Sequence, residues 1–122
     1  MRANWFEIPV LDMARAQKFY ATIFDVEMGE SFEMGESMMS FFPFVEDQDG
    51  ATGTLIQHET YKPSHEGVMV YFSVREINDV LVRIPKANGK VINEKSSIGE
   101  HGFVAHFEDS EGNRVALHQA AQ

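Results

Sequence analysis

The segment Ile8-Pro9-Val10-Leu11-Asp12-Met13 has a counterpart 64 positions later in Phe72-Ser73-Val74-Arg75-Glu76-Ile77. In both segments, the apolar end of a strand leads into an acidic residue that is suited to cap a helix. A second pair follows in the same order, because Glu46-Asp47-Gln48-Asp49-Gly50 returns 62 positions later as Glu108-Asp109-Ser110-Glu111-Gly112. Matches in the same order at nearly constant spacing predict an internal repeat.

The repeat divides the 122 residues into two modules, residues 1–62 and 63–122. The connection between them, residues 59–67, is polar and contains Pro63 and Gly67, as expected of a linker. A module of about sixty residues is too small to bury a substantial core alone. We therefore expect the two modules to pack together.

Each module is predicted to have the element order β-α-β-β-β. The first helix should begin after Asp12, and the second should begin near Ile77. Pro85 cannot continue the second helix, so we expect that helix to end near Arg83, with Asn88-Gly89 as a further stop signal. Strands are predicted at residues 4–10, 26–32, 38–45, 53–58, 68–74, 91–97, 103–108 and 114–119.

The composition excludes several classes of function. The chain has 19 acidic and 10 basic side chains, and its formal charge of −9 disfavours nucleic acids and anionic membrane surfaces as partners. It has no cysteine, which rules out a disulfide framework, a cysteine-based zinc site and a thiol nucleophile. No apolar run is long enough for a membrane span or a signal peptide. We expect a cytoplasmic domain that acts on a small molecule.

Three motifs resemble the vicinal oxygen chelate superfamily, the glyoxalase, bleomycin-resistance and extradiol-dioxygenase group, and within it the small bacterial proteins related to lactoylglutathione lyase. They are Phe6-Glu7-Ile8-Pro9-Val10-x-Asp12, Ala16-x-x-Phe19-Tyr20, and Asp109-x-Glu111-Gly112-Asn113 before Leu117-His118. The resemblance implies an α+β fold in which two βαβββ modules form a curved mixed β-sheet with a cleft, and it implies a homodimer. It leaves the reaction open, because this fold hosts isomerases, lyases, dioxygenases, thiol transferases and metal-free antibiotic binders.

In the metal-dependent members of the superfamily, four residues on the first and last strands of the modules hold a divalent ion. The resemblance puts these positions at Trp5, Ile56, Met69 and Ala116. Such a site needs carboxylate and imidazole ligands, so we expect no metal and no other cofactor there. This argues against glyoxalase and extradiol-dioxygenase chemistry, both of which need the ion. A slip of one residue would present Gln57 in place of Ile56.

A polar layer is expected two residues further along the same strands, because side chains two apart share a face. It consists of Glu7, His58, Tyr71 and His118. Three interpretations remain open: structural hydrogen bonding or ligand orientation, acid/base catalysis by Glu7, His58 and His118, and an unconventional metal site with two histidines and one carboxylate. Arg114 lies two residues before Ala116, on the same face of the strand, and it either steers an anionic ligand or is merely solvated.

The predicted ligand-binding residues combine both layers: Trp5, Glu7, Ile56, His58, Met69, Tyr71, Ala116 and His118. Within this set, Trp5, Met69 and Tyr71 would make an apolar floor on which a flat ligand can stack. His106, between Ala105 and Phe107, is expected on the face away from the core. Three functions remain: binding or converting a small organic molecule without the usual metal, binding an antibiotic-type ligand without turnover, and metal-dependent chemistry at a displaced site.

Overall fold

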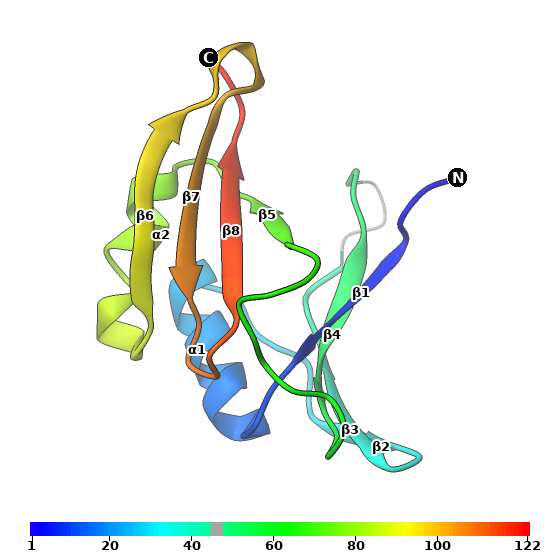
Figure 1. Cartoon of the computed structure of the whole chain (residues 1–122). Helices are drawn as coiled ribbons and strands as arrows, with labels where there is room; N and C mark the ends of the chain where they lie inside the picture. The colour runs from blue at the N-terminus through cyan, green and yellow to red at the C-terminus, as the bar shows by residue number, and fades with distance from the viewer. Residues whose placement is uncertain (45–47) are drawn as a thin grey trace.

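The computed structural model describes residues 1–44 and 48–122, which form two four-stranded mixed sheets with helices packed against them (Figure 1). The elements of the first half are β1 (Trp5–Pro9), α1 (Met13–Phe24), β2 (Phe32–Met34), β3 (Ser37–Phe41) and β4 (Thr52–Gln57). Those of the second half are β5 (Tyr71–Ser73), α2 (Ile77–Leu81), the 3₁₀ turn η1 (Pro85–Ala87), β6 (Lys90–Ser97), the 3₁₀ turn η2 (Gly99–His101), β7 (Phe103–Glu108) and β8 (Arg114–Gln119). None of the helices in these ranges is long and apolar enough to cross a membrane.

The strand order confirms the predicted α+β fold with two βαβββ modules. Sheet A has the order β1-β4-β3-β2, and sheet B has the order β5-β8-β7-β6. In both sheets, the first and last strands of the module are parallel neighbours, and the other pairs are antiparallel. The two sheets are therefore equivalent in topology, as an internal repeat requires.

Both acidic residues that were expected to cap helices do so. The side chain of Asp12 accepts a hydrogen bond from the backbone N–H of Arg15 at 3.0 Å, and that of Glu76 accepts one from Asn78 at 3.0 Å. The second helix ends two residues earlier than predicted, at Leu81. Pro85 then begins the separate turn η1 rather than continuing the helix.

The predicted strand at residues 26–32 is wrong, because strand β2 begins only at Phe32. The Gly29 carbonyl oxygen accepts hydrogen bonds from the Gln17 amide at 3.0 Å and the Ser40 hydroxyl at 2.7 Å. These side chains donate hydrogen bonds to a carbonyl that a neighbouring strand would otherwise bind.

The predicted strand at 68–74 is also shorter than expected, since β5 covers only Tyr71–Ser73 and Val68 is exposed to solvent. The strand predicted at 38–45 is too long, because β3 ends at Phe41 and residues 42–44 are not strand. Residue 45 lies outside the described residues, and so do Glu46 and Asp47 of the first acidic turn.

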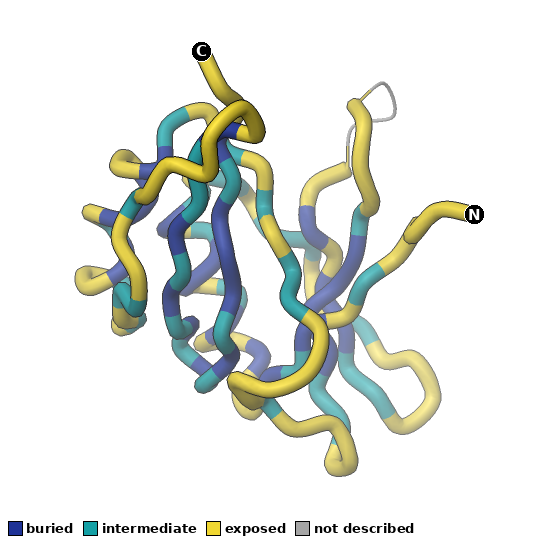
Figure 2. The backbone as a smooth tube through the Cα atoms, turned by 45° about the horizontal axis from the view of Figure 1, so that its top comes forward, coloured by how far each residue is buried: buried dark blue, intermediate teal, exposed yellow. Residues whose placement is uncertain are grey.

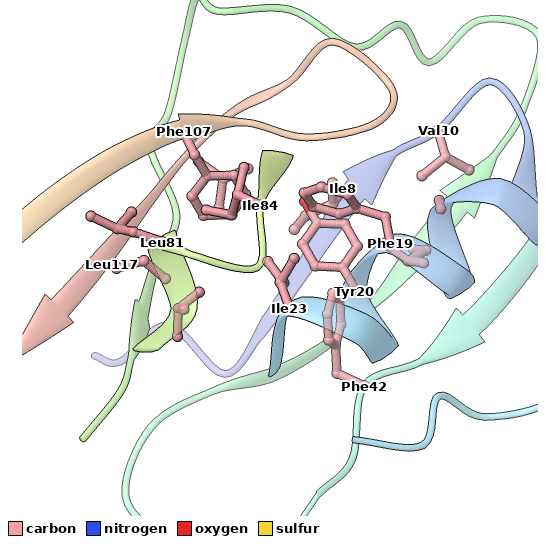
Figure 3. Close-up of a cluster of buried hydrophobic side chains, with 14 of the residues drawn as sticks. Ile8, Val10, Phe19, Tyr20, Ile23, Phe42, Leu81, Ile84, Phe107 and Leu117 are labelled. Carbon is pink, nitrogen blue, oxygen red and sulfur yellow. The ribbon is translucent and has the colours of Figure 1, made fainter. Parts of the chain in front are cut away.

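A single core joins the two sheets through α1, which lies between them (Figures 1 and 3). The ring of Phe19 lies 6.0 Å from that of Phe107 in sheet B, and Tyr20 lies 5.3 Å from Phe42, which follows β3 in module one. We call the faces turned toward α1 and α2 the inner faces and the opposite ones the outer faces. Because both inner faces meet the same core, the outer faces point away from it.

The turn between β7 and β8 fastens the second module to the first. Glu111 accepts hydrogen bonds from the backbone of Leu11 and Asp12, both at 2.8 Å, and its other oxygen lies 2.7 Å from Nε of Arg15. The carboxylate of Glu111 is fully buried, whereas Arg15 is half exposed. The turn therefore holds the start of α1 in place.

Two further side chains of this turn reach module one. Asp109 accepts a hydrogen bond from the hydroxyl of the buried Tyr20 at 2.6 Å, and Asn113 donates to the carbonyl of Pro9 at 2.8 Å. Burial and the carboxylate of Asp109 raise the pKa of Tyr20 well above its ordinary value. The phenol therefore stays protonated and acts as a permanent donor across the boundary between the modules.

Candidate functional site

The outer face of sheet A carries alternate residues of its four strands. Ile8 on β1 and Leu55 on β4 belong to the core, so their strand neighbours face outward. The strand register brings these outward side chains side by side. They are Trp5 and Glu7 on β1, Thr52, Thr54 and Ile56 on β4, Met39 and Phe41 on β3, and Phe32 on β2.

Three aromatic side chains form a row across this face, and we call Trp5, Phe41 and Phe32 the aromatic row. The rings of Trp5 and Phe41 meet edge to face at 5.4 Å, and those of Phe41 and Phe32 are stacked at 5.6 Å with 13° between their planes. Trp5 and Phe41 are each 41% exposed. Adjacent exposed aromatic rings offer a surface on which a flat apolar group can stack.

Two threonine hydroxyls lie beside this row without a partner. Thr52 is paired with Trp5 across β1 and β4, and Thr54 is paired with Phe41 across β3 and β4. Both Oγ1 atoms are buried, and neither makes a hydrogen bond within the described part of the chain. A buried hydroxyl without a partner costs roughly 1–3 kcal/mol. Because both oxygens are closed off from solvent, a ligand could reach them only if neighbouring side chains moved aside.

The outer face of sheet B carries a group of side chains with polar ends. Tyr71 on β5, His106 on β7 and Arg114 on β8 form a connected group, which we call the Tyr71–His106–Arg114 array. The hydroxyl of Tyr71 lies 3.4 Å from Nε2 of His106, and Nε of Arg114 donates to Nδ1 of the same ring at 3.0 Å. Three strands thus contribute one side chain each.

The array fixes the protonation of His106. Burial and the positive charge of Arg114 both lower the pKa of His106, so the imidazole is neutral near pH 7. Since Nδ1 accepts the hydrogen bond from Arg114, the single ring proton sits on Nε2. That N–H faces the oxygen of Tyr71, and the hydroxyl proton of Tyr71 remains free to be donated.

The structure puts the eight predicted ligand-binding residues on two separate surfaces. Trp5, Glu7 and Ile56 lie on sheet A and His58 directly follows β4, whereas Tyr71, Ala116 and His118 lie on sheet B and Met69 precedes β5. No hydrogen bond, ion pair or aromatic contact joins the two sets in residues 1–44 and 48–122. Within one chain, the two sets therefore belong to different sheets.

The parallel register of β1 and β4 separates two of the four metal positions. Trp5 lies opposite Thr52, and Ile56 lies opposite Pro9, four residues further along. This spacing corresponds to about 13 Å along the strand. The side chains that accompany Trp5 are therefore the two threonines and not Ile56.

Each of the two histidines of the predicted polar layer uses a ring nitrogen in a hydrogen bond to a loop or turn. Nδ1 of His58 accepts from the backbone N–H of Thr60 at 3.1 Å, and its Nε2 lies 3.8 Å from a carboxylate oxygen of Glu36. His58 also borders an acidic surface hollow of about 350 Å³. Nε2 of His118 donates to the carbonyl of His101 at 2.6 Å. Glu7 is exposed on the face of sheet A.

His106 is the residue that the sequence interpretation put on the right face but did not connect to the site. The alternation of Ala105, His106 and Phe107 predicts its outward direction, and the burial of both neighbours confirms it. Its contact with Tyr71 depends on the register of β7 on β8, where His106 lies opposite Ala116. Ala116 in turn lies opposite Tyr71. The contact could have been predicted by extending the outer face of sheet B from the parallel pair β5 and β8 to the next strand, β7.

The family model for the Glyoxalase/Bleomycin resistance protein/Dioxygenase superfamily matches residues 2–117, and the chain therefore belongs to this superfamily. This confirms the resemblance seen in the sequence motifs. No curated protein sequence matches the chain.

Solved structures with the same fold include enzymes and a binding protein. A glyoxylase/bleomycin resistance protein/dioxygenase domain from Frankia sp. EAN1pec has a TM-score of 0.75 at 15% identity, covering 99% of this chain and 98% of that one. TnmS3, an antibiotic binding protein from Streptomyces sp. CB03234, has a TM-score of 0.69 at 16% identity, covering 99% and 97%. At such identities the likeness shows the fold alone.

A glyoxalase I mutant from Zea mays has a TM-score of 0.71 at 14% identity, covering 95% of this chain and 45% of that one. The chain thus spans less than half the length of this protein and of a second maize glyoxalase I structure, of which it covers 46%.

The four residues that the sequence resemblance assigns to metal binding do not come together in one site, since Trp5 and Ile56 are four residues apart in the register, and their side chains do not fit the ion of the metal-dependent members. An indole, an isoleucine and an alanine offer no ligand atom, and the thioether of Met69 is a poor ligand for a hard or borderline ion. Elsewhere in the described ranges, no three histidine, aspartate or glutamate side chains are grouped so as to hold one. We therefore derive no chemical step through a metal.

Proposed function

We propose that this protein binds a small organic molecule with a flat apolar part, without a metal ion at the four positions of the metal-dependent members. The observation that carries the proposal is the aromatic row, in which Trp5 and Phe41 are each 41% exposed. The row offers the apolar stacking area that typically lines ligand sites.

We infer that the ligand is bound and released unchanged. Two of the three candidate acid/base groups use a ring nitrogen in a hydrogen bond to the backbone, His58 to Thr60 in the loop after β4 and His118 to His101 in the turn η2, which suits a structural role. The likeness to an antibiotic binding protein, TnmS3, shows that this fold can serve binding. Binding without turnover is thus favoured over acid/base catalysis by Glu7, His58 and His118.

We also propose that the protein is a homodimer in which the outer face of sheet A of one copy meets that of sheet B of the other. The support is the exposure of large side chains on both faces, with Trp5 41% and Tyr71 49% exposed. Such a pairing would bring the two sets of predicted ligand-binding residues together around one cleft.

The binding proposal is tested with the fluorescence of Trp5, the single tryptophan of the chain. A library of flat aromatic fragments is titrated, and we expect some of them to change the Trp5 emission in a saturable way. Phe41→Ala removes the central ring of the row and should weaken the best fragment about tenfold, since aromatic pairs contribute roughly 0.5–1.5 kcal/mol beyond the area they bury.

Val82→Ala is the matched control, because Val82 is exposed at the end of α2 and lies outside the row. It should leave the affinity unchanged. The absence of any saturable binder, or equal affinity in the Phe41→Ala variant, would contradict the proposal. Mass spectrometry of the recovered fragment should find it unmodified, and turnover that is lost in Glu7→Gln would instead support an enzyme.

A further inference from the structure

We propose that the outer face of sheet B binds the carboxylate of a flat organic acid through Arg114, while Tyr71 contacts a polar group at the far end of the same molecule. The inference rests on the proposed function, because it names the chemical class of the small molecule. It is carried by the Tyr71–His106–Arg114 array, whose two outer members lie on opposite sides of the His106 ring.

The charge of Arg114 has no counter-ion among the described residues. Its side-chain hydrogen bonds go to neutral groups: Nε donates to His106 at 3.0 Å, and Nη2 lies 3.3 Å from the amide oxygen of Asn93 when that amide donates to the carbonyl of Ile92. Glu108 is paired with Arg114 across β7 and β8, but its carboxylate binds His65 at 2.8 Å instead. Of the five arginines, only Arg15 has an ion pair in the described part of the chain, so what distinguishes Arg114 is its place in the array on the outer face of sheet B.

The remaining donors of Arg114 suit a carboxylate. Two of the five guanidinium N–H groups are used by His106 and Asn93, which leaves three. The guanidinium is planar and delocalised, so its free N–H groups present a fork that matches the two oxygens of a carboxylate. The hydrogen bond to His106 holds the fork in one orientation, which lowers the entropy lost when an anion binds.

Tyr71 supplies the second contact. Its oxygen receives the Nε2–H of His106, and its own hydroxyl proton is free, so it can donate to a hydroxyl or carbonyl of the ligand. Tyr71 is 49% exposed, and its ring meets that of His106 at right angles at 5.8 Å. Because Tyr71 and Arg114 flank the imidazole, one flat molecule lying over His106 can reach both.

The test titrates the 122-residue chain with four small probes and follows binding by ¹H–¹⁵N NMR. The probes are benzoate, 4-hydroxybenzoate, benzyl alcohol and benzylamine. We expect benzoate to bind at least about tenfold more tightly than benzyl alcohol or benzylamine, as a charge-assisted hydrogen bond allows. The shifted signals should include the Arg114 Nε–H and the backbone amides of β7 and β8, and 4-hydroxybenzoate should bind more tightly than benzoate.

Variants assign the two ends of the ligand. Arg114→Gln should weaken benzoate about tenfold and leave benzyl alcohol unchanged, whereas Arg75→Gln removes the same charge from an exposed residue and should change neither. Arg114→Lys keeps the charge but loses the fork, so its affinity for benzoate should lie between those of the wild type and Arg114→Gln. Tyr71→Phe should abolish the gain from 4-hydroxybenzoate and leave benzoate unaffected.

The selectivity of the wild-type protein is decisive even if a variant does not fold. Equal binding of benzoate, benzyl alcohol and benzylamine would overturn the inference while leaving the proposed binding function intact. Failure of benzoate to bind would also overturn it, and the proposed function would still be judged by its own Trp5 titration. Full benzoate affinity in a folded Arg114→Gln variant, or an unchanged preference for 4-hydroxybenzoate in Tyr71→Phe, would likewise refute the assignment.

Discussion

Glu111 shows how a single buried carboxylate can hold two modules together. Burial alone would raise the pKa of Glu111, but the hydrogen bonds from Arg15, Asp12, Ser110 and Leu11 outweigh it and hold the pKa below its ordinary value of 4.5. The folded protein therefore stabilises the ionised form of Glu111. The interaction joins the turn after β7 to the start of α1.

Glu111→Gln is expected to destabilise the fold by about 2 kcal/mol at neutral pH, since it weakens charge-assisted hydrogen bonds to a half-exposed arginine. Because the folded pKa of Glu111 is depressed, its contribution is fully present above about pH 4.5 and is lost as the pH falls through the folded pKa. Urea unfolding between about pH 3 and pH 7 should therefore show the wild type and the variant converging in acid.

Glu94→Gln makes the same change on the exposed surface of β6 and should alter stability by less than about 0.5 kcal/mol. A gap between wild type and Glu111→Gln that stays constant throughout the acid range would contradict the role given to the carboxylate.

Residues whose role depends on near neighbours could be predicted from the sequence, and those that depend on strand pairing could not. Asp12 and Glu76 were expected as caps because a cap is recognised within three residues of the helix it begins. The connection of His106 to Tyr71 spans 35 positions and requires the order β5-β8-β7. The aromatic row was only partly foreseen, because Phe41 and Phe32 reach Trp5 only through the register of sheet A.

At the scale of the elements, Gly89 allows the helix of one module to approach the sheet of the other. A Cβ at this position would lie 2.5 Å from a ring carbon of Phe19 on α1 and 2.8 Å from the backbone oxygen of Glu108 on β7. Any residue with a Cβ at position 89, directly before β6, would therefore displace α1 or β7.

Gly89→Ala should lower the free energy of unfolding by about 1–3 kcal/mol, the usual cost of overpacking, because a backbone oxygen cannot move aside as a side chain can. Thermal and urea unfolding measure this change. Gly29→Ala is the control, since its Cβ would lie 3.4 Å from its nearest neighbours. Equal stability of both variants with the wild type would show that α1 and β7 are less closely packed at Gly89 than described.

The elements that were predicted best are those whose periodicity is not interrupted by side-chain hydrogen bonds. Strands β7 and β8 have the expected limits, Phe103–Glu108 and Arg114–Gln119, because inward and outward residues alternate along both. The segment before β2 contains apolar residues but is held by Gln17 and Ser40 through the carbonyl of Gly29. Such contacts between distant positions are invisible to a local pattern.

At the scale of the whole molecule, both sheets turn one face toward the helices, and buried and exposed residues alternate along the strands (Figure 2). The exposed large apolar residues include Trp5 and Phe41 on the outer face of sheet A and Tyr71 on that of sheet B. Exposed aromatic side chains grouped on a face are typical of an interaction surface. This arrangement motivates a test of the proposed dimer.

Sedimentation velocity between about 1 and 100 µM should find a dimer that dissociates on dilution. Trp5→Glu puts a charge into the proposed interface and should shift the equilibrium toward the monomer by at least about tenfold in Kd. Val82→Glu adds the same charge at an exposed residue beside α2 and should have no effect. A wild-type monomer over the whole range would overturn the proposed pairing of outer faces.

The hydrogen bonds of Glu111 to the first module also have a consequence for synthesis of the chain on the ribosome. The hydrogen bonds from Leu11 and Asp12 to Glu111 join positions 100 and 99 apart in the sequence. At about 5–20 residues per second, a ribosome needs on the order of 5–20 s to add the residues between them. During that time the apolar surface of the nascent first module is uncovered, and the chain can aggregate or be bound by chaperones. This period ends only when the last hairpin, β7 and β8, has been made and packs against the first module.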